Sequence, residues 1–365
     1  MAGTVLEYLE EMGEYSCGQI PFGEADALVM CQLAYLKYDC LVPGIYENKS
    51  SVCIRNLSKS QRFHEIFEDP FFEKQNKELY KRVVNSKRFG YLRINGYVDI
   101  YDTDREIQFC AMTFLVPEGP VFIAFRGTDE TLAGWKENMN MSLEAPVPCQ
   151  KYSAVYLNMI AKKIQGSFLV GGHSKGGNLA VYGASKCFTE IQNRIDTIYC
   201  LDGPGFSSRV LEEGLYNNTM KKTVKLLPAY SFIGRLFEKE YRGRTIRSRG
   251  LGLMQHDLFT WEIKEGKFVE EKHGIHESTI LDKGINQWVG TLSYQERKLF
   301  CDTIYKVLSE GGIMDLKAFT AEGKNSMLSL AGIIRKMDRC TMITMSKMIC
   351  SLFEILGGLL ERNEK

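Results

Sequence analysis

The stretch Gly171-Gly172-His173-Ser174-Lys175-Gly176-Gly177-Asn178-Leu179-Ala180 is the most informative segment of this chain. It contains the G-x-S-x-G pattern of a nucleophile elbow, with Ser174 at its centre. The apolar run 167–170 before it reads as a short buried strand, and small and apolar residues at helical spacing follow it. Because glycine has no Cβ, strand and helix can approach closely on both sides of the serine. The stretch therefore predicts a strand, a sharp turn and a helix that present Ser174 as a nucleophile; the alternative is an ordinary glycine-rich turn.

Hydrophobic periodicity on either side of this stretch predicts an α/β fold. Residues 1–90 read as mostly helical, an amphipathic helix is expected over 150–165, and residues 291–365 turn helical again. Strand-like runs lie at 91–94, 96–101, 107–115, 121–125, 195–201, 223–227 and 244–248. Strands that alternate with helices indicate a parallel or mixed sheet. We expect one domain over residues 1–305, with its helical N-terminal part at 1–90, and a helical C-terminal extension over 306–365.

Composition narrows the class of protein. The chain has 365 residues, of which 44% are hydrophobic and 25% charged, as is typical of soluble globular proteins. A net charge of +1 gives no electrostatic case for binding nucleic acid or an anionic membrane. The acidic N-terminus lacks the apolar core of a signal peptide, and no run of eighteen uncharged apolar residues occurs. The segment 333–360 is therefore interpreted as a helix packed on the body, with an interfacial membrane helix as the alternative.

The cysteines indicate the compartment. Eleven are scattered along the chain without a C-x-x-C pair or a zinc-ligand spacing, and several lie in strand-like runs. Their odd number and placement suggest reduced, buried thiols in a cytoplasmic protein. No metal or organic cofactor is implied.

A serine nucleophile needs a general base, and the chain offers five histidines. His64 precedes the predicted sheet, and the side chain of His173, inside the elbow, is expected to point away from that of Ser174. The other three, His256, His273 and His276, follow the elbow, where the hydrolase order serine, acid, histidine places the base. His256 is favoured because it follows a probable strand and a glycine turn. His273 and His276 resemble a charged surface turn.

The acid and the oxyanion donors are expected at the carboxyl ends of neighbouring strands. Asp202 ends the first strand after the elbow and is the best candidate for the acid, although it could simply begin an Asp-Gly-Pro-Gly turn. Asp257 is adjacent to His256 and is not expected to reach its Nδ1. The backbone N–H of Lys175 and the loop that carries Thr128 are candidate donors to an oxyanion. The alternative for that loop is an ordinary helix cap.

Several of these segments resemble a known family. Phe125-Arg126-Gly127-Thr128, Trp135 and the elbow look like the core of class 3 (fungal-type) lipases. The chain more closely resembles the bacterial Mbeg1-like (DUF2974) family of α/β-hydrolases over roughly residues 5–305. The remaining segments that carry this resemblance are 21–38, 201–206, 227–234 and 255–257.

This resemblance implies a lipase class 3-like α/β-hydrolase fold with a mostly parallel central sheet and helical regions at both ends. It implies Ser174 as nucleophile, His256 as base, and Thr128 and Lys175 as oxyanion donors. Class 3 lipases place the acid in the segment that corresponds to 228–234, where this chain has Ser231, so Asp202 would be a migrated acid.

The lipase pattern also places a lid after the oxyanion loop, where Leu132, Trp135 and Met139 stand; a buried amphipathic helix explains them equally well. We therefore expect a serine esterase or lipase-like enzyme acting on a small-molecule or lipid acyl ester. It would have no nucleic-acid partner and no stable membrane insertion, although peripheral membrane contact remains possible. The alternative is a catalytically weakened hydrolase-fold protein with a binding or regulatory role.

Overall fold

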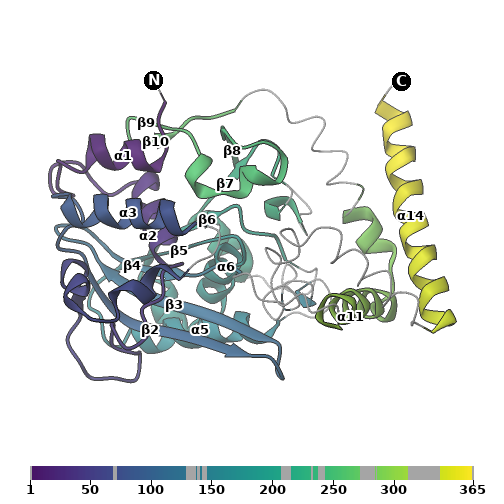
Figure 1. The fold of residues 1–365 in the computed structure, drawn as a ribbon, viewed down its shortest axis with the longest axis horizontal. Coiled ribbons are helices and arrows are strands. Elements are labelled where there is room, and N and C mark those ends of the chain that lie inside the picture. The colour runs from purple at the N-terminus through teal and green to yellow at the C-terminus, as the bar shows by residue number, and fades with distance from the viewer. Residues whose placement is uncertain are drawn as a thin grey trace.

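The computed structural model describes residues 2–68, 72–128, 137, 140–141, 146–206, 215–231, 233–236, 243–271, 284, 286–310 and 338–363. A central sheet runs through these residues with helices on both of its faces (Figure 1). Helices α1 (Val5–Met12), α2 (Glu24–Leu33) and α3 (Glu73–Asn85) cover one face. Helices α5 (Pro148–Ile160) and α6 (Lys175–Lys186) cover the other. The result is a three-layer α/β/α arrangement.

Eight strands form the sheet in sequence order, from β1 to β8. Their bounds are β1 (Val52–Cys53), β2 (Arg93–Asp102), β3 (Ile107–Leu115), β4 (Val121–Phe125), β5 (Phe168–His173), β6 (Ile195–Leu201), β7 (Thr223–Pro228) and β8 (Arg244–Ile246). The first three pairings, from β1 to β4, are antiparallel, and the four pairings from β4 to β8 are parallel. The predicted α/β-hydrolase fold with a mostly parallel sheet is thereby confirmed. The four parallel connections place the carboxyl ends of β4 to β8 along one edge.

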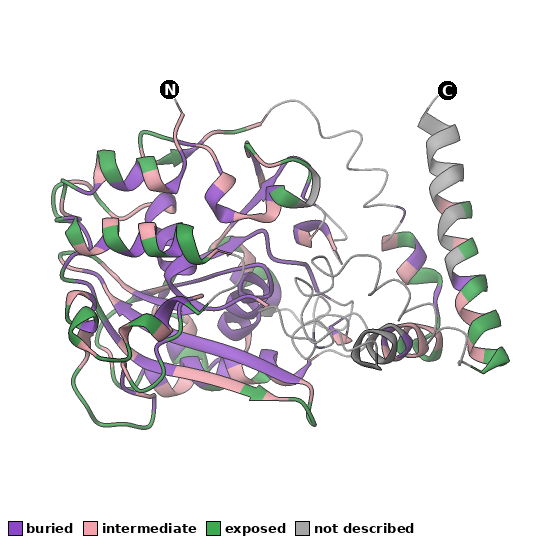
Figure 2. Cartoon of the chain, in the orientation of Figure 1, coloured by how far each residue is buried: buried purple, intermediate pink, exposed green. Residues whose placement is uncertain are grey.

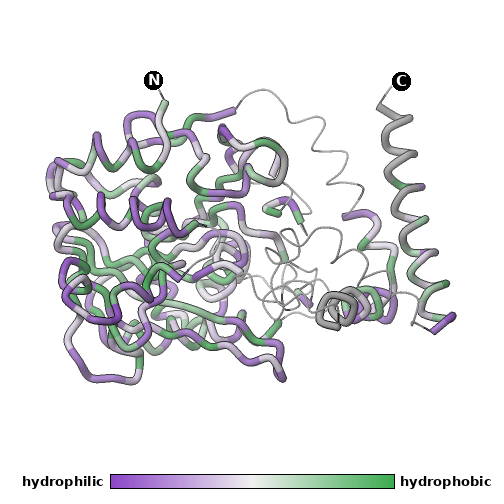
Figure 3. The backbone as a smooth tube through the Cα atoms, viewed as in Figure 1, coloured by the Kyte–Doolittle hydropathy of each residue, from purple (hydrophilic) through white to green (hydrophobic). Residues whose placement is uncertain are grey.

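Strict alternation along the central strands separates two hydrophobic cores. In β3, Cys110, Met112 and Phe114 face the core under α1, α2 and α3, whereas Phe109 and Ala111 face the core under α5 and α6. Successive side chains of a strand point to opposite faces, so a strand buried on both sides reads as an unbroken apolar run. Figure 2 shows the buried residues concentrated in this sheet, and Figure 3 shows its strands as the most continuous apolar part of the chain.

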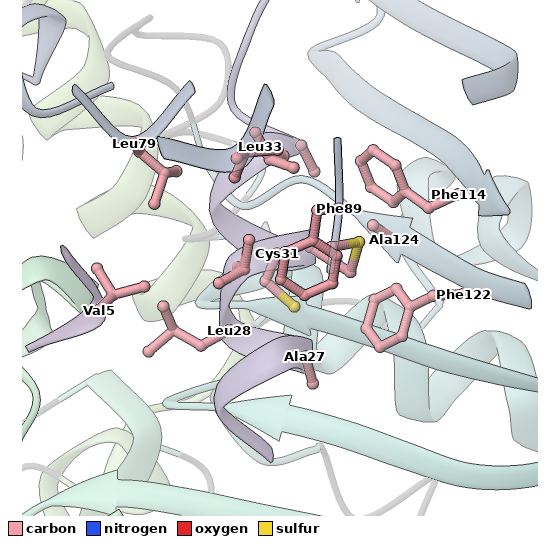
Figure 4. Packing of buried hydrophobic residues seen from close by; sticks show 14 of the residues in the cluster. Val5, Ala27, Leu28, Cys31, Leu33, Leu79, Phe89, Phe114, Phe122 and Ala124 are labelled. Atoms are coloured by element: carbon pink, nitrogen blue, oxygen red, sulfur yellow. The ribbon is translucent and has the colours of Figure 1, made fainter. Parts of the chain in front are cut away.

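The N-terminal helices contribute much of the first core. Leu28 and Cys31 of α2 belong to the same core as Phe114 and Phe122 of the sheet. Leu28 lies on the side of the helix that faces Val5 of α1 (Figure 4). One fully buried ion pair holds this layer: the Arg88 guanidinium donates to Asp26 Oδ1 at 2.7 Å and to Oδ2 at 2.5 Å. A further helical residue of this layer, Leu79 on α3, lies nearby (Figure 4). The predicted helical N-terminal region is present.

Two local features differ from the sequence-based expectation. The runs expected as separate strands at 91–94 and 96–101 form the single strand β2, whose register shifts between Asn95 and Val98. Gly96 has φ +65° there, a conformation that favours glycine and that lets the strand bulge without ending. Within residues 1–90, which read as mostly helical, the structure also contains the strand β1, followed by the 3-10 helix η1 (Ile54–Lys59).

The remaining elements are short or C-terminal. They are η2 (Phe63–Phe67), α7 (Thr189–Gln192), α9 (Leu215–Lys221), η3 (Ile233–Arg235), η4 (Gly252–His256), η5 (Leu258–Thr260), β9 (Ile263–Lys264), β10 (Lys267–Phe268), α11 (Tyr294–Glu310) and α14 (Arg339–Asn363). Trp288 donates to the carbonyl of Met348 at 2.8 Å and so joins the segment before α11 to α14. The division at residue 305 stays a prediction. In the described part of the chain, no helix combines the length and apolarity needed to cross a membrane.

Candidate active site

Ser174 occupies the sharp turn between β5 and α6. Its backbone has φ 56° and ψ −130°, a strained conformation for a residue with a Cβ. A Cβ at Gly172 would lie 2.3 Å from backbone atoms of Gly176, and one at Gly176 would lie 2.1 Å from the Phe125 carbonyl oxygen. Both glycines are therefore required by close backbone packing, as expected for a nucleophile elbow. The turn leaves the Ser174 side chain at the carboxyl edge of the sheet.

Asp202 and His256 meet at the same edge. Asp202 directly follows β6, is fully buried and has φ 49°. His256 ends η4, and its Nδ1 lies 2.6 Å from Asp202 Oδ2. Because a carboxylate only accepts, Nδ1 carries the hydrogen, which leaves Nε2 as the basic nitrogen of the neutral ring. The structure thus brings the predicted base and the predicted acid into direct contact.

Ser231 lies on the same carboxylate. Its hydroxyl donates to Asp202 Oδ2, the oxygen that also faces His256. The other oxygen, Oδ1, is packed so closely against Gly234 that a Cβ there would approach to 2.3 Å. The segment 228–234, where class 3 lipases were expected to carry their acid, therefore converges on Asp202 from the neighbouring strand. The position that departs from the lipase pattern therefore contributes a hydrogen-bond donor to the Asp202 carboxylate.

Asp257, unlike Asp202, makes a local hydrogen bond to the backbone. Its Oδ1 accepts the backbone N–H of Phe259 at 2.9 Å, so it caps the 3-10 helix η5. Burial raises the pKa of this carboxyl to about 6, and the hydrogen bond and nearby His256 only partly oppose that rise. His256 Nδ1 donates to Asp202 and not to Asp257, which was not expected to reach it.

The loop after β4 lies beside the elbow. Arg126 makes a two-pronged ion pair with Asp99 of β2, at 2.9 and 2.8 Å, and its backbone N–H donates to the Cys110 carbonyl. Gly127 has no room for a side chain, because a Cβ would lie 2.1 Å from Tyr35 Oη and 2.7 Å from the His173 carbonyl oxygen. These contacts fix the backbone immediately before Thr128, which is half-buried.

Lys175 supplies both a backbone and a side chain to the site. Its N–H belongs to the first turn of α6, where N–H groups have no partner within the helix. Its fully buried ammonium donates to the Gln108 carbonyl at 2.7 Å, to Gln108 Oε1 and to Glu137 Oε2 at 3.1 Å. Glu137 also accepts the N–H groups of Gln108 and Cys149, at 3.0 and 3.1 Å. Every proton of the ammonium thus has an acceptor in a closed network.

Sequence reasoning missed the partners of this lysine. Gln108 gives one signal, since it and Thr113 are the polar residues of a strand that is otherwise apolar. Glu137 gives none: it is separated by 38 residues from Lys175, and no local pattern distinguishes it from other charged residues. Gln108 also extends the network toward the oxyanion loop, because its Nε2 lies 3.5 Å from the Gly127 carbonyl oxygen.

The side chain of His173 was expected to point away from that of Ser174. Its buried ring lies against the ring of His256, with 4.4 Å between their centroids. Its Nε2 is 2.9 Å from the His256 carbonyl oxygen, and its Nδ1 is 2.9 Å from Tyr35 Oη. The residue before Ser174 thus contacts the residue expected to act as base.

The other candidates do not join this cluster. His64 lies on an exposed 3-10 turn, where its Nδ1 is 3.1 Å from the Gln61 carbonyl oxygen. His273 and His276 lie outside the described residues, as do Leu132, Trp135 and Met139 of the expected lid. Among the residues that the structure describes, no group of three metal-ligating side chains is close enough to hold an ion. All eleven cysteines are described, and all are free.

The sequence matches a known protein family. A family model described as Mbeg1-like matches residues 83–306, which is more than half of the chain. No curated protein matches the sequence. A solved structure with a similar course of the chain is a crystal structure of M37 lipase, which is 14% identical. The similarity covers 58% of this chain and 68% of the lipase chain, with a TM-score of 0.36.

Proposed function

The chain belongs to the Mbeg1-like family, and we propose that it is a serine hydrolase that cleaves an acyl ester through an acyl-enzyme on Ser174. One observation carries the proposal: a strained elbow serine shares the carboxyl edge of the sheet with the hydrogen-bonded pair of Asp202 and His256. Nucleophile, acid and base then come from segments that follow β5, β6 and β8. This is the division of roles that acyl transfer by a serine requires.

The chemistry follows from the hydrogen-bond directions. The Ser174 hydroxyl attacks the ester carbonyl carbon while His256 Nε2 takes its proton. Asp202 stabilises the resulting imidazolium through Nδ1 and keeps the ring in the required tautomer. The carbonyl oxygen becomes an oxyanion, which the N–H of Lys175 and the Thr128 segment would stabilise. His256 then gives its proton to the leaving alcohol. A water molecule next attacks the acyl-enzyme, again with His256 as base, which releases the carboxylic acid product and regenerates Ser174.

The substrate class is proposed from the family resemblance to lipases, which favours a lipid or other small acyl ester. The buried free thiols support a reducing, cytoplasmic setting. The rival function, a binding or regulatory role for a weakened hydrolase, rested on Ser231 in place of an acid. That argument loses weight because Ser231 donates to the carboxylate that faces His256.

A chain-length series of p-nitrophenyl esters tests the proposal. We expect a rapid burst of p-nitrophenol followed by slower turnover, and an added acyl mass on the tryptic peptide that contains Ser174. Ser174→Ala, which keeps the elbow and removes the nucleophile, serves as the matched control. If the wild-type protein hydrolyses none of the series, or if Ser174→Ala shows the same burst, the proposal is wrong.

A further inference from the structure

We propose that His173 and Tyr35 form a positioning pair that holds the backbone of His256, the base of the proposed reaction on which this inference rests. Tyr35 follows α2 in the N-terminal region, His173 ends β5, and His256 ends η4. Residues separated by 138 and by 83 positions in the chain are thus joined by two hydrogen bonds, each 2.9 Å long.

The direction of both hydrogen bonds follows from the chemistry of the atoms. The carbonyl oxygen of His256 can only accept, so His173 Nε2 must carry a hydrogen and donate it. In a neutral imidazole the other nitrogen is then an acceptor, so the Tyr35 hydroxyl donates to His173 Nδ1. The pair therefore has one tautomer and one orientation. A ring held at both nitrogens is a rigid support for the loop that it contacts.

His173 contacts the residue whose position the proposed reaction depends on most closely, which is His256. His173 holds the main chain of His256, while Asp202 holds the Nδ1 of the same residue. The two imidazole rings also lie face to face at a tilt of 35°. With backbone, ring face and Nδ1 all held, the direction of His256 Nε2 is determined, and Nε2 is the atom that must meet the serine hydroxyl.

His173 is also suited to lie beside a ring that becomes charged. Burial, followed by the repulsion from His256, holds the pKa of His173 well below its usual 6.5. His173 therefore stays neutral when His256 takes up the proton of the nucleophile. Two adjacent imidazolium rings in this buried position would repel each other strongly.

Tyr35 extends the support to the oxyanion loop. Its hydroxyl occupies the space where a Cβ of Gly127 would lie, 2.1 Å away. The same hydroxyl thus contacts the residue next to Thr128 and the ring that holds His256. The N-terminal layer, which precedes the matched family segment, in this way reaches both the base and the oxyanion loop.

Two amide substitutions separate positioning from simple packing. The amide nitrogen of glutamine reaches as far as imidazole Nε2, so His173→Gln can still donate to the His256 carbonyl. The shorter amide of asparagine corresponds to Nδ1, so His173→Asn cannot. Both variants remove the ring, and a purely structural role would affect them alike.

The kinetic arm measures kcat and KM for a p-nitrophenyl ester, with the melting temperature of each variant as the folding control. We expect His173→Asn to lose kcat by about tenfold to a hundredfold with KM nearly unchanged, because the base is displaced rather than the substrate. His173→Gln should recover at least about half of that loss on a logarithmic scale. Equal kcat values for the two variants, or a wild-type kcat in His173→Asn, would overturn the inference. Should His173→Asn not fold, Tyr35→Phe takes its place, with a reduced kcat expected and an unchanged kcat contradicting the proposal.

A second arm does not depend on activity. In protein labelled with ¹⁵N-histidine, nuclear magnetic resonance should show His173 as the neutral tautomer with hydrogen on Nε2, and Tyr35→Phe should shift its Nδ1 signal. A hydrogen on Nδ1 would overturn the inference. If the wild-type protein hydrolyses no ester while His173 shows the expected tautomer, the proposed hydrolase function has failed and the hydrogen-bonded pair has not.

Discussion

Two buried ion pairs of this protein have the same exposure and different surroundings. Arg88 with Asp26 and Lys175 with Glu137 each have side chains that are 1% exposed. Arg88 also donates to the carbonyl of Ile20 at 3.0 Å and so fastens the loop before α2. Lys175 instead joins the elbow to β3 and to the start of α5 through Gln108 and Glu137. Burial does not distinguish structural from functional charges, whereas the segments that each pair connects do.

The comparison predicts that polar groups at the carboxyl edge govern activity and that those under the N-terminal helices govern stability. Asp202→Asn should give the largest effect on activity. Because asparagine cannot hold His256 in the required tautomer, we expect kcat to fall by about three to four orders of magnitude. The measurement is hydrolysis of an activated ester, with thermal unfolding as the folding control. A loss of only a few-fold in a folded variant would mean that Asp202 is not the acid.

Lys175→Met and Arg88→Met form a matched pair. Each leaves a buried carboxylate without its cation, so each should lower the free energy of unfolding by roughly 3–5 kcal/mol. Urea unfolding measures both losses. The double variants Lys175→Met/Glu137→Gln and Arg88→Met/Asp26→Asn remove both charges and should regain much of the stability.

Activity then separates the two pairs. We expect the double variant at Lys175 and Glu137 to remain about tenfold or more below wild type in kcat, because the support of the elbow and of the Gln108 contact to Gly127 is lost. The double variant at Arg88 and Asp26 should keep wild-type kcat per folded molecule. Equal activity losses in the two double variants would break the comparison.

Asp257 offers a smaller and pH-dependent effect. In the folded protein this carboxyl keeps its proton up to about pH 6, whereas an unfolded aspartate releases its proton near pH 4. Its contribution to stability is therefore present below pH 4 and is lost as the pH rises to 6. Asp257→Asn avoids the buried charge, so it should be more stable than wild type by roughly 1–3 kcal/mol above pH 6 and similar below pH 4. Urea unfolding at pH 4 and 7.5 checks this, and a destabilised variant at pH 7.5 would contradict it.

Ser231→Ala should give the smallest effect. The hydroxyl donates to Asp202 Oδ2, and its loss removes one of the groups that support the acid. We expect kcat to fall by about threefold to tenfold with little change in melting temperature, the range of a single hydrogen bond. A loss as large as that of Asp202→Asn would mean that Ser231 does more than support the carboxylate.

The local sequence pattern predicted most strands of the sheet and one contact of the candidate site, between Asp202 and His256. The strands at 107–115 and 121–125 agree with β3 and β4, because a strand buried on both faces leaves a mostly apolar run. The strand at 195–201 agrees with β6. The contact between Asp202 and His256 was predictable because the parallel strands of one sheet end at the same edge.

Contacts that depend on distant segments were not predictable. Glu137 and Tyr35 contact the elbow across 38 and 138 residues of sequence, and neither position carries a local signal. The hydrogen bond of Ser231 was not predicted for a related reason: the sequence shows that an expected carboxylate is replaced, but only the folded chain shows which atom the hydroxyl contacts. These buried contacts of the candidate site therefore depend on tertiary packing and not on a local sequence motif.

The nucleophile assignment of Ser174 is the central claim, and labelling with a fluorophosphonate probe tests it most directly. The probe reacts with an activated serine and leaves a stable adduct whose position mass spectrometry can identify. We predict one adduct per wild-type molecule on the Ser174 peptide, no adduct in Ser174→Ala, and slow labelling in Asp202→Asn. Absence of labelling in the folded wild-type protein, or equal labelling of Ser174→Ala, would contradict the account.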